Sequence, residues 1–260
     1  MIIELLGPPA AGKTTLAPAV ASALRQIGFE VNLITSSRPN EQSPSQRREA
    51  SMSPPLYSAL FSPLSRATKL VGAATTFLPK LHGERAALEL LTLLPPQSLL
   101  WSIRYRRYLT LLTQSWNEAR RSKKITIFDQ GYLQALCSLC LVTKPVDSEV
   151  LVDGMKLIPR SDLVVHIDAP LEILESRLRN RIRELGPVER LFELDLHTNL
   201  KQIEVDQRVI EFLERTGRPI THVRCLDRRM LEDAASEISH RVAKMLDPAR
   251  SHMESRICRT

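Results

Sequence analysis

The nine residues from Gly7 to Thr15, GPPAAGKTT, constrain this chain more than any other stretch. They match a pattern of glycine, four residues and then Gly-Lys-Thr, and they lie between an apolar run, Met1 to Leu6, and a helical pattern that begins near Lys13. In that setting the glycines allow a tight turn whose backbone N–H groups face a phosphate, and the new helix adds its positive dipole end. The stretch therefore predicts a strand, a phosphate-binding loop and a helix that together bind a nucleoside triphosphate.

The loop residues have separate predicted contacts. Lys13 is a movable cation for the β- and γ-phosphates, Thr14 offers its hydroxyl to Mg²⁺, and Thr15 is placed for a backbone or α-phosphate contact. The predicted nucleotide-binding set is Gly7, Pro8, Pro9, Ala10, Ala11, Gly12, Lys13, Thr14 and Thr15.

Buried strands alternate with helices along the chain. The strand signals are residues 1–6, 29–35, 124–129, 162–168 and 219–226, and the principal helical patterns are 84–94, 101–121, 132–142, 171–185, 191–215 and 231–246. This alternation predicts an α/β fold with a doubly wound five-stranded parallel sheet and the nucleotide at the carboxyl ends of its strands. We expect one domain over 1–246, with a helical insertion or acceptor region at 40–100, an arginine-rich lid at 177–190 and a flexible tail at 247–260.

Composition narrows the class of protein. The chain is 43% hydrophobic, and no apolar run reaches the roughly 18 residues of a membrane span. It begins directly with a strand and lacks the basic region and cleavage site of a secretory signal, so we expect a cytoplasmic protein without a transmembrane segment. Cys137 and Cys140 form a lone CxxC in a helical run, which favours buried reduced thiols over a metal site.

The net charge of +7 raises the question of a nucleic-acid partner. The arginines gather at 104–121 and 177–190, beside the expected anionic-substrate machinery, so we expect a polyphosphate ligand and no nucleic acid. The apolar part of the insertion, 56–100, has three open interpretations: an acceptor-binding segment, a homodimer face or a membrane-surface patch.

Two polar residues follow predicted strands. Asp129 ends the strand 124–129, where it can hold Mg²⁺ through water or accept a proton from the attacking group; otherwise it caps the helix 132–142. Arg38 lies just beyond the strand 29–35 and is either an acceptor-site cation or a solvated loop arginine.

Two helices carry arginines that could enter a cleft. In the helix 101–121, helical phase places Arg104 beside the apolar stripe and turns Arg106 and Arg107 toward solvent.

In the helix 171–185, Arg177 and Arg181 share one face, and Arg179 and Arg183 share another. Like charges at this spacing repel, so we expect anionic partners for them. The Gly-Pro that follows favours a closing lid over a solvated charged face.

Two other classes of phosphate-loop protein, translational-type GTPases and remodelling or transport ATPases, are disfavoured. A guanine-reading Asn/Thr-Lys-x-Asp motif is missed by one residue at 143–147, and Gln130 stands where a water-activating glutamate would follow the strand-end Asp129.

The order of these parts resembles the thymidylate kinase branch of the nucleoside monophosphate kinase-like family. The segments that carry the resemblance are GPPAAGKTT, SSRP at 36–39, RYRRY before IFDQG, PRSDLVVHIDAPLEIL and RLRNRIRELGPVERLFE. They span most of the chain, although the phosphate loop alone is specific by itself.

The resemblance implies ATP and Mg²⁺ as cofactors of a kinase, with Arg38 on the acceptor phosphate. It implies that Arg107 is the acceptor-side helix arginine, whereas helical phase selects Arg104. It also implies that Asp129 organises the acceptor or metal.

The lid residues Arg177, Arg181 and Arg190 would neutralise the transferring phosphoryl group. The sequence departs from the family on the acceptor side: Gln130 replaces an arginine, SSRPNE lacks the Glu-Pro-Gly-Gly continuation, and 40–100 is longer and more apolar.

The hypothesis from sequence is therefore an ATP-dependent phosphotransferase acting on a small molecule, with Gln130 among the acceptor-side residues. Two alternatives stay open: a kinase of a non-nucleotide acceptor, and a nucleotide-dependent regulator or assembly factor.

Overall fold

A five-stranded parallel sheet forms the centre of the molecule. The computed structural model describes residues 1–35, 84–184 and 194–246, and within them the strand order is β2-β3-β1-β4-β5. The strands are β1 (Ile2–Leu6), β2 (Val31–Ile34), β3 (Ile125–Phe128), β4 (Leu163–Asp168) and β5 (Ile220–Arg224). All four pairings are parallel, which confirms the predicted fold class.

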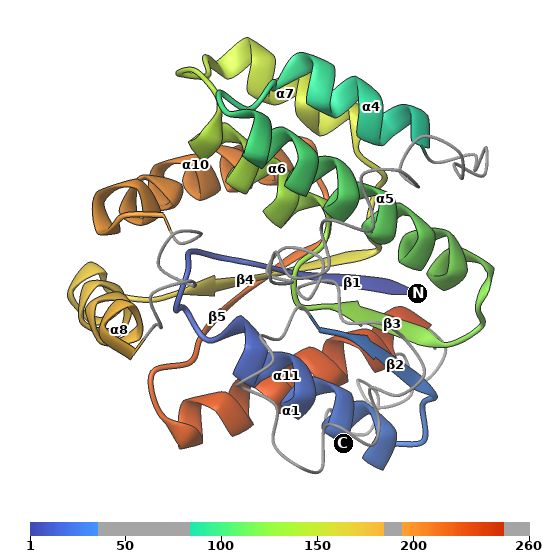
Figure 1. The fold of residues 1–260 in the computed structure, drawn as a ribbon. Coiled ribbons are helices and arrows are strands. Elements are labelled where there is room, and N and C mark those ends of the chain that lie inside the picture. The colour runs from blue at the N-terminus through green and yellow to red at the C-terminus, as the bar shows by residue number, and fades with distance from the viewer. Residues whose placement is uncertain (36–83, 185–193, 247–260) are drawn as a thin grey trace, which may run out of the picture.

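Helices cover both faces of the sheet (Figure 1). They are α1 (Lys13–Gln26), α4 (Glu84–Leu93), α5 (Leu99–Arg121), α6 (Tyr132–Val142), α7 (Ser148–Leu157), α8 (Leu171–Glu184), α10 (Leu196–Arg215) and α11 (Arg228–Leu246). Helices α1 and α11 pack together on one face, while α5, α6 and α10 cover the other, with α4 and α7 outside them. Helix α8 lies near the carboxyl ends of β4 and β5 (Figure 1).

Strand β1 is buried on both faces because it lies between β3 and β4. Successive side chains of a strand point to opposite faces. Ile3 and Leu5 accordingly join the core beneath α1 and α11, whereas Ile2 and Leu6 join the core beneath α5, α6 and α10. Glu4 shares the second face and is also buried, which places a carboxylate inside an apolar layer.

The elements largely follow the predicted ones, with shorter strand ends. Strand β2 covers four of the seven residues predicted for it, and α7 is a helix that the pattern did not predict. Asp147 begins α7 by accepting a hydrogen bond from the backbone N–H of Val150 (2.9 Å), a common helix start. Within the described ranges, no helix is both long enough and apolar enough to cross a membrane.

Candidate active site

A cleft of about 1110 Å³ lies at the carboxyl edge of the sheet. Its lining residues come from the loop after β1 and from α1, α5, α6, α8 and α10, together with the turn between β5 and α11. Open parallel sheets place ligands at this edge, where the helices that follow two neighbouring strands pack on opposite faces, as α1 after β1 and α6 after β3 do here (Figure 1). The fold thus brings together segments that are far apart in the sequence.

The phosphate loop follows β1 in the conformation that its glycines allow. Gly12 has a φ of 107° and Gly7 a φ of 155°, and a Cβ on Gly7 would lie 2.7 Å from the carbonyl oxygen of Ile167. Ala10 also has a positive φ, 66°, which is strained for a residue with a side chain. Together these residues turn the chain sharply between β1 and the first turn of α1.

Lys13 is folded back over this loop. Its Nζ donates hydrogen bonds to the carbonyl oxygens of Gly7 (2.5 Å) and Pro8 (2.9 Å). Burial lowers the pKa of Lys13 to about 8, and the negative charges of Asp206 and Asp129 oppose that decrease. A buried cation at the base of the cleft is therefore available to an anionic ligand.

The loop presents hydroxyl groups to the cleft, while the predicted metal carboxylate lies deeper. Thr14 and Thr15 are exposed and line the cleft, whereas Asp129 is fully buried and is not among the lining residues. Among the residues that the structure describes, no group of three or more His, Cys, Asp or Glu side chains could hold a metal ion. A Mg²⁺ ion that keeps phosphate and water ligands would fit the single hydroxyl of Thr14.

Asp129 is not the cap of α6. Gly131 occupies the N-cap position and has no side chain that could cap the helix. The turn is instead held from below, because Glu4 Oε1 accepts a hydrogen bond from the backbone N–H of Leu133 (3.1 Å). The Tyr108 hydroxyl donates to the carbonyl oxygen of Gln130 (3.3 Å), and the Gln130 side chain lines the cleft.

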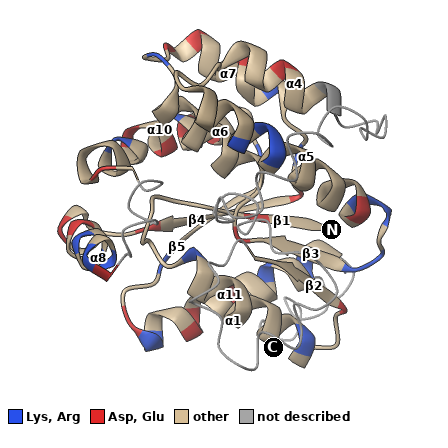
Figure 2. Ribbon diagram, in the orientation of Figure 1, with Lys and Arg blue, Asp and Glu red and all other residues tan. Residues whose placement is uncertain are grey.

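The four arginines of α8 divide between two surfaces, as their spacing predicts. Arg177 and Arg181 line the cleft, while Arg179 and Arg183 lie on the outer surface with acidic neighbours. Arg179 bonds Glu175 through Nη2 (2.5 Å) and Nε (3.1 Å). Figure 2 shows both signs of charge on this helix.

Arg177 links the phosphate loop to the turn after β5. Its Nη1 donates to the carbonyl oxygen of Ala10 (3.2 Å), and its Nη2 donates to that of Leu226 (3.0 Å). These bonds tie the strained part of the loop to the segment that precedes α11. In this conformation Arg177 supports the loop and borders the cleft at the same time.

A second wall of the cleft comes from α5 and α6. Trp101 and Tyr105 lie with ring centroids 5.9 Å apart, and the Arg104 guanidinium lies over the Trp101 ring at 4.6 Å. Arg104 is 7% exposed and lines the cleft, whereas Arg107 is exposed and outside it. Between these two arginines, the structure therefore places Arg104 in the position that helical phase predicts.

Gln134 of α6 completes this wall. Its side chain is 5% exposed, and its Oε1 has no hydrogen-bond partner among the described residues. Buried amide oxygens are usually paired, so an unpaired one in a cleft is suited to a ligand donor.

Two predicted site residues, Arg38 and Arg190, lie outside the described residues, as do the larger part of the insertion, the end of the lid and the tail. Cys137 and Cys140 are free cysteines on α6; Cys137 is buried, as predicted, whereas Cys140 is half-buried.

Sequence reasoning missed three buried polar residues: Glu4 on β1, and Gln202 and Asp206 on α10. Glu4 interrupts the apolar run of β1, and Gln202 and Asp206 occupy the stripe of α10 that continues with Val209 and Leu213. A polar residue at an apolar position of the pattern is the signal that could have revealed them.

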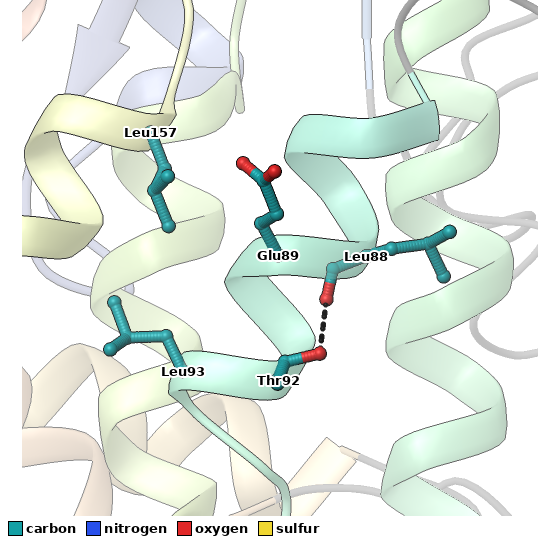
Figure 3. A pocket seen from close by; sticks show the side chains of 5 residues that line it. All are labelled: Leu88, Glu89, Thr92, Leu93 and Leu157. Atoms are coloured by element: carbon teal, nitrogen blue, oxygen red, sulfur yellow. Dashed lines mark hydrogen bonds between the residues drawn. The ribbon is translucent and has the colours of Figure 1, made fainter.

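A second cavity, of about 700 Å³, lies between α4 and α7. Figure 3 shows its five lining residues: Leu88, Glu89, Thr92, Leu93 and Leu157. The Thr92 hydroxyl donates a hydrogen bond to the carbonyl oxygen of Leu88 (2.9 Å), one turn earlier in the same helix. This mainly apolar cavity lacks the glycine-rich loop and the cations that line the first cleft.

No protein-family model matches the sequence, and no curated protein matches it. Among solved structures, the chain is similar to a deoxyadenosine kinase from M. mycoides, whose structure has dCMP and a flexible dCDP bound as products. The two share 13% sequence identity with a TM-score of 0.47, over 94% of this chain and 100% of the kinase. The fold class itself rests on the parallel sheet and the phosphate loop described above, which are those of a P-loop α/β protein.

Proposed function

We propose that the chain is an ATP-dependent kinase that transfers the γ-phosphate of ATP to a small acceptor molecule. The observation that carries this proposal is a single cleft that joins the phosphate loop to a second wall on α5 and α6. Its volume of about 1110 Å³ lies at the upper end of single-ligand pockets, which suits two substrates side by side. A protein that bound ATP alone would have no need of the second wall.

The donor half would act by positioning and by neutralising charge. Lys13 would contact the β- and γ-phosphates, and Thr14 would hold Mg²⁺, which supplies a further positive charge to the phosphates. Arg181 lines the same cleft as Lys13 and would neutralise charge on the transferring group. The resemblance implies the same role for Arg190, which lies outside the described residues. Fixed cations of this kind stabilise charge that develops as the phosphoryl group moves in line.

The acceptor half favours a planar or anionic molecule. Trp101 and Tyr105 offer aromatic faces, Arg104 offers a cation, and Gln134 offers an unpaired amide oxygen. The resemblance to the thymidylate kinase branch makes a nucleoside monophosphate the first acceptor to test, with its phosphate near Arg104 or Arg38. Because Gln130 replaces the family's arginine, nucleosides and non-nucleotide hydroxyl compounds belong in the same test.

The test is a panel of acceptors incubated with γ-labelled ATP and Mg²⁺. Transfer of label to one acceptor class, with a rate that saturates in both substrates, is the expected result. Binding and hydrolysis of ATP without label on any acceptor would contradict the proposal and favour the nucleotide-dependent regulator.

Matched variants separate the two halves of the cleft. Lys13→Met should lower kcat/KM for ATP by about 10²-fold or more, because it removes a charge on the transferring phosphate. Arg104→Met should raise the acceptor KM by about tenfold and leave ATP binding intact, because charged hydrogen bonds contribute about 1.5–3 kcal/mol. Arg106→Met is the control, since Arg106 is exposed on the same helix and lies outside the cleft.

A further inference from the structure

Two polar side chains of α10 are buried beneath the phosphate loop. Gln202 and Asp206 are each 2% exposed and lie one helical turn apart. Gln202 Nε2 lies 3.5 Å from the carbonyl oxygen of Gly7 and 3.4 Å from Asp206 Oδ1. The same carbonyl of Gly7 accepts the 2.5 Å hydrogen bond from Lys13 Nζ. Lys13 and Asp206 are thus connected through one carbonyl group and one amide.

The carboxylate of Asp206 is poorly satisfied by its surroundings. Asp206 Oδ2 has no hydrogen-bond partner in the described part of the chain, and the Cys137 thiol is the other polar group beside the carboxylate. Burial raises the pKa of Asp206 to about 6, while the positive charge of Lys13 opposes that rise. Among the charged groups around Lys13, Asp206 has the largest effect on the pKa of Lys13, ahead of Asp129.

A buried charge is costly unless an opposite charge lies near it. Lys13 donates to two carbonyl oxygens and forms no ion pair within the described residues, so a nearby carboxylate stabilises its charge through the low-dielectric interior. Bound phosphates would supply the same negative charge from the other side of Lys13. The phosphates and Asp206 would then repel each other across the loop.

We propose that Asp206 is the resident counter-charge of the phosphate loop, which stabilises Lys13 while the cleft is empty and weakens the binding of a polyphosphate. This rests on the proposed function only in that the loop binds phosphates. Asp206 is a positioning residue, since it acts through Lys13 and Gln202. Stability of the empty protein is thereby balanced against affinity for the donor.

The first experiment is a double-mutant cycle on the empty protein at pH 7. The free energy of unfolding is measured for wild type, Lys13→Met, Asp206→Asn and the double variant. We expect a coupling equivalent to about tenfold in the folding equilibrium, because each single variant leaves one buried charge without its partner. Additive effects would overturn the proposal. Should Asp206→Asn alone fail to fold, a folded double variant supports the proposal and an unfolded one contradicts it.

The second experiment measures the binding of inorganic tripolyphosphate, which excludes contacts to a base or sugar. Asp206→Asn should bind it about tenfold more tightly than wild type, since one negative charge has left the low-dielectric surroundings of the loop. Glu204→Gln is the control: it makes the same change in net charge at an exposed position of α10 and should change the affinity less than about twofold. Weaker binding by Asp206→Asn would show a structural role and overturn the proposal.

The two experiments separate this inference from the proposed function. If Lys13→Met binds tripolyphosphate as well as wild type does, the phosphate-loop function fails, yet the cycle still reports whether Lys13 and Asp206 interact. If wild type binds tripolyphosphate through Lys13 but the cycle is additive, the inference fails and the function stands.

Discussion

Glu4 gives the chain a stability that should depend on pH in a defined direction. The side chain lies inside the apolar layer beneath α6, where burial raises its pKa from 4.5 to about 7. A carboxyl group whose pKa is higher in the folded state favours folding least when it is ionised in both states. Its contribution is therefore most favourable below pH 4.5 and is lost as the pH rises through about 7.

The magnitude follows from the two pKa values. Their difference, about 7 minus 4.5, multiplied by about 1.4 kcal/mol per pKa unit, gives a cost of about 3–4 kcal/mol when Glu4 is ionised. Glu4→Gln removes this cost, and the amide oxygen can still accept the hydrogen bond from the Leu133 N–H. The variant should gain stability relative to wild type as the pH rises, with most of the gain between about pH 5 and 8.

The assay is urea-induced unfolding of both proteins at a series of pH values. The difference between the two free energies of unfolding is the quantity to plot, because the titrations of all other groups, Asp206 included, largely cancel in it. A rise of about 2–3 kcal/mol between pH 5 and 8 is expected. A difference that stays flat with pH would refute the reasoning, since Glu4 would then have the same pKa in both states.

Two further predictions concern the residues that support the cleft. Gly131→Ala should destabilise the protein by about 1–3 kcal/mol in urea unfolding, because a Cβ there would overlap Glu4 Oε1. The backbone φ of −104° suits any residue, so the overlap is the expected cause. Wild-type stability would contradict this placement of Glu4. Arg177→Met should raise the KM for ATP about tenfold through loss of its bonds to the carbonyl oxygens of Ala10 and Leu226, with the fold retained by circular dichroism. An unchanged KM would show that the loop keeps its shape without Arg177.

Local patterns determined most of the secondary structure and the glycine-rich loop after β1. The apolar run of β1, the Gly-rich loop and the amphipathic helices each depend on residues that are neighbours in the sequence, so their positions follow from spacing and propensity. Strand β2 was predicted too long because its pairing with β3, which only the tertiary structure provides, covers Val31 to Ile34. Helix α7 was missed because its N-cap, Asp147, was not recognised.

Predictions about which side chains reach the cleft had mixed outcomes. Helical phase correctly selected Arg104 for the cleft, since that residue's direction is a property of its own helix. The depth of Asp129 beneath the cleft could not be read in this way, because it depends on how α6 and the neighbouring strands pack over that position.

The sequence by itself determined that this chain carries a phosphate loop on a parallel α/β sheet, because glycine spacing and strand periodicity are local. The tertiary structure alone decided that Gln202 and Asp206 are buried near that loop and that Glu4 is buried beneath α6. Their burial arises where β1, α6 and α10 meet. Gln202 and Gly7, which are in contact there, are 195 residues apart in the chain. The charge environment of Lys13 is therefore a property of the packing, because a carboxylate acts through space and its distance along the chain has no bearing on it.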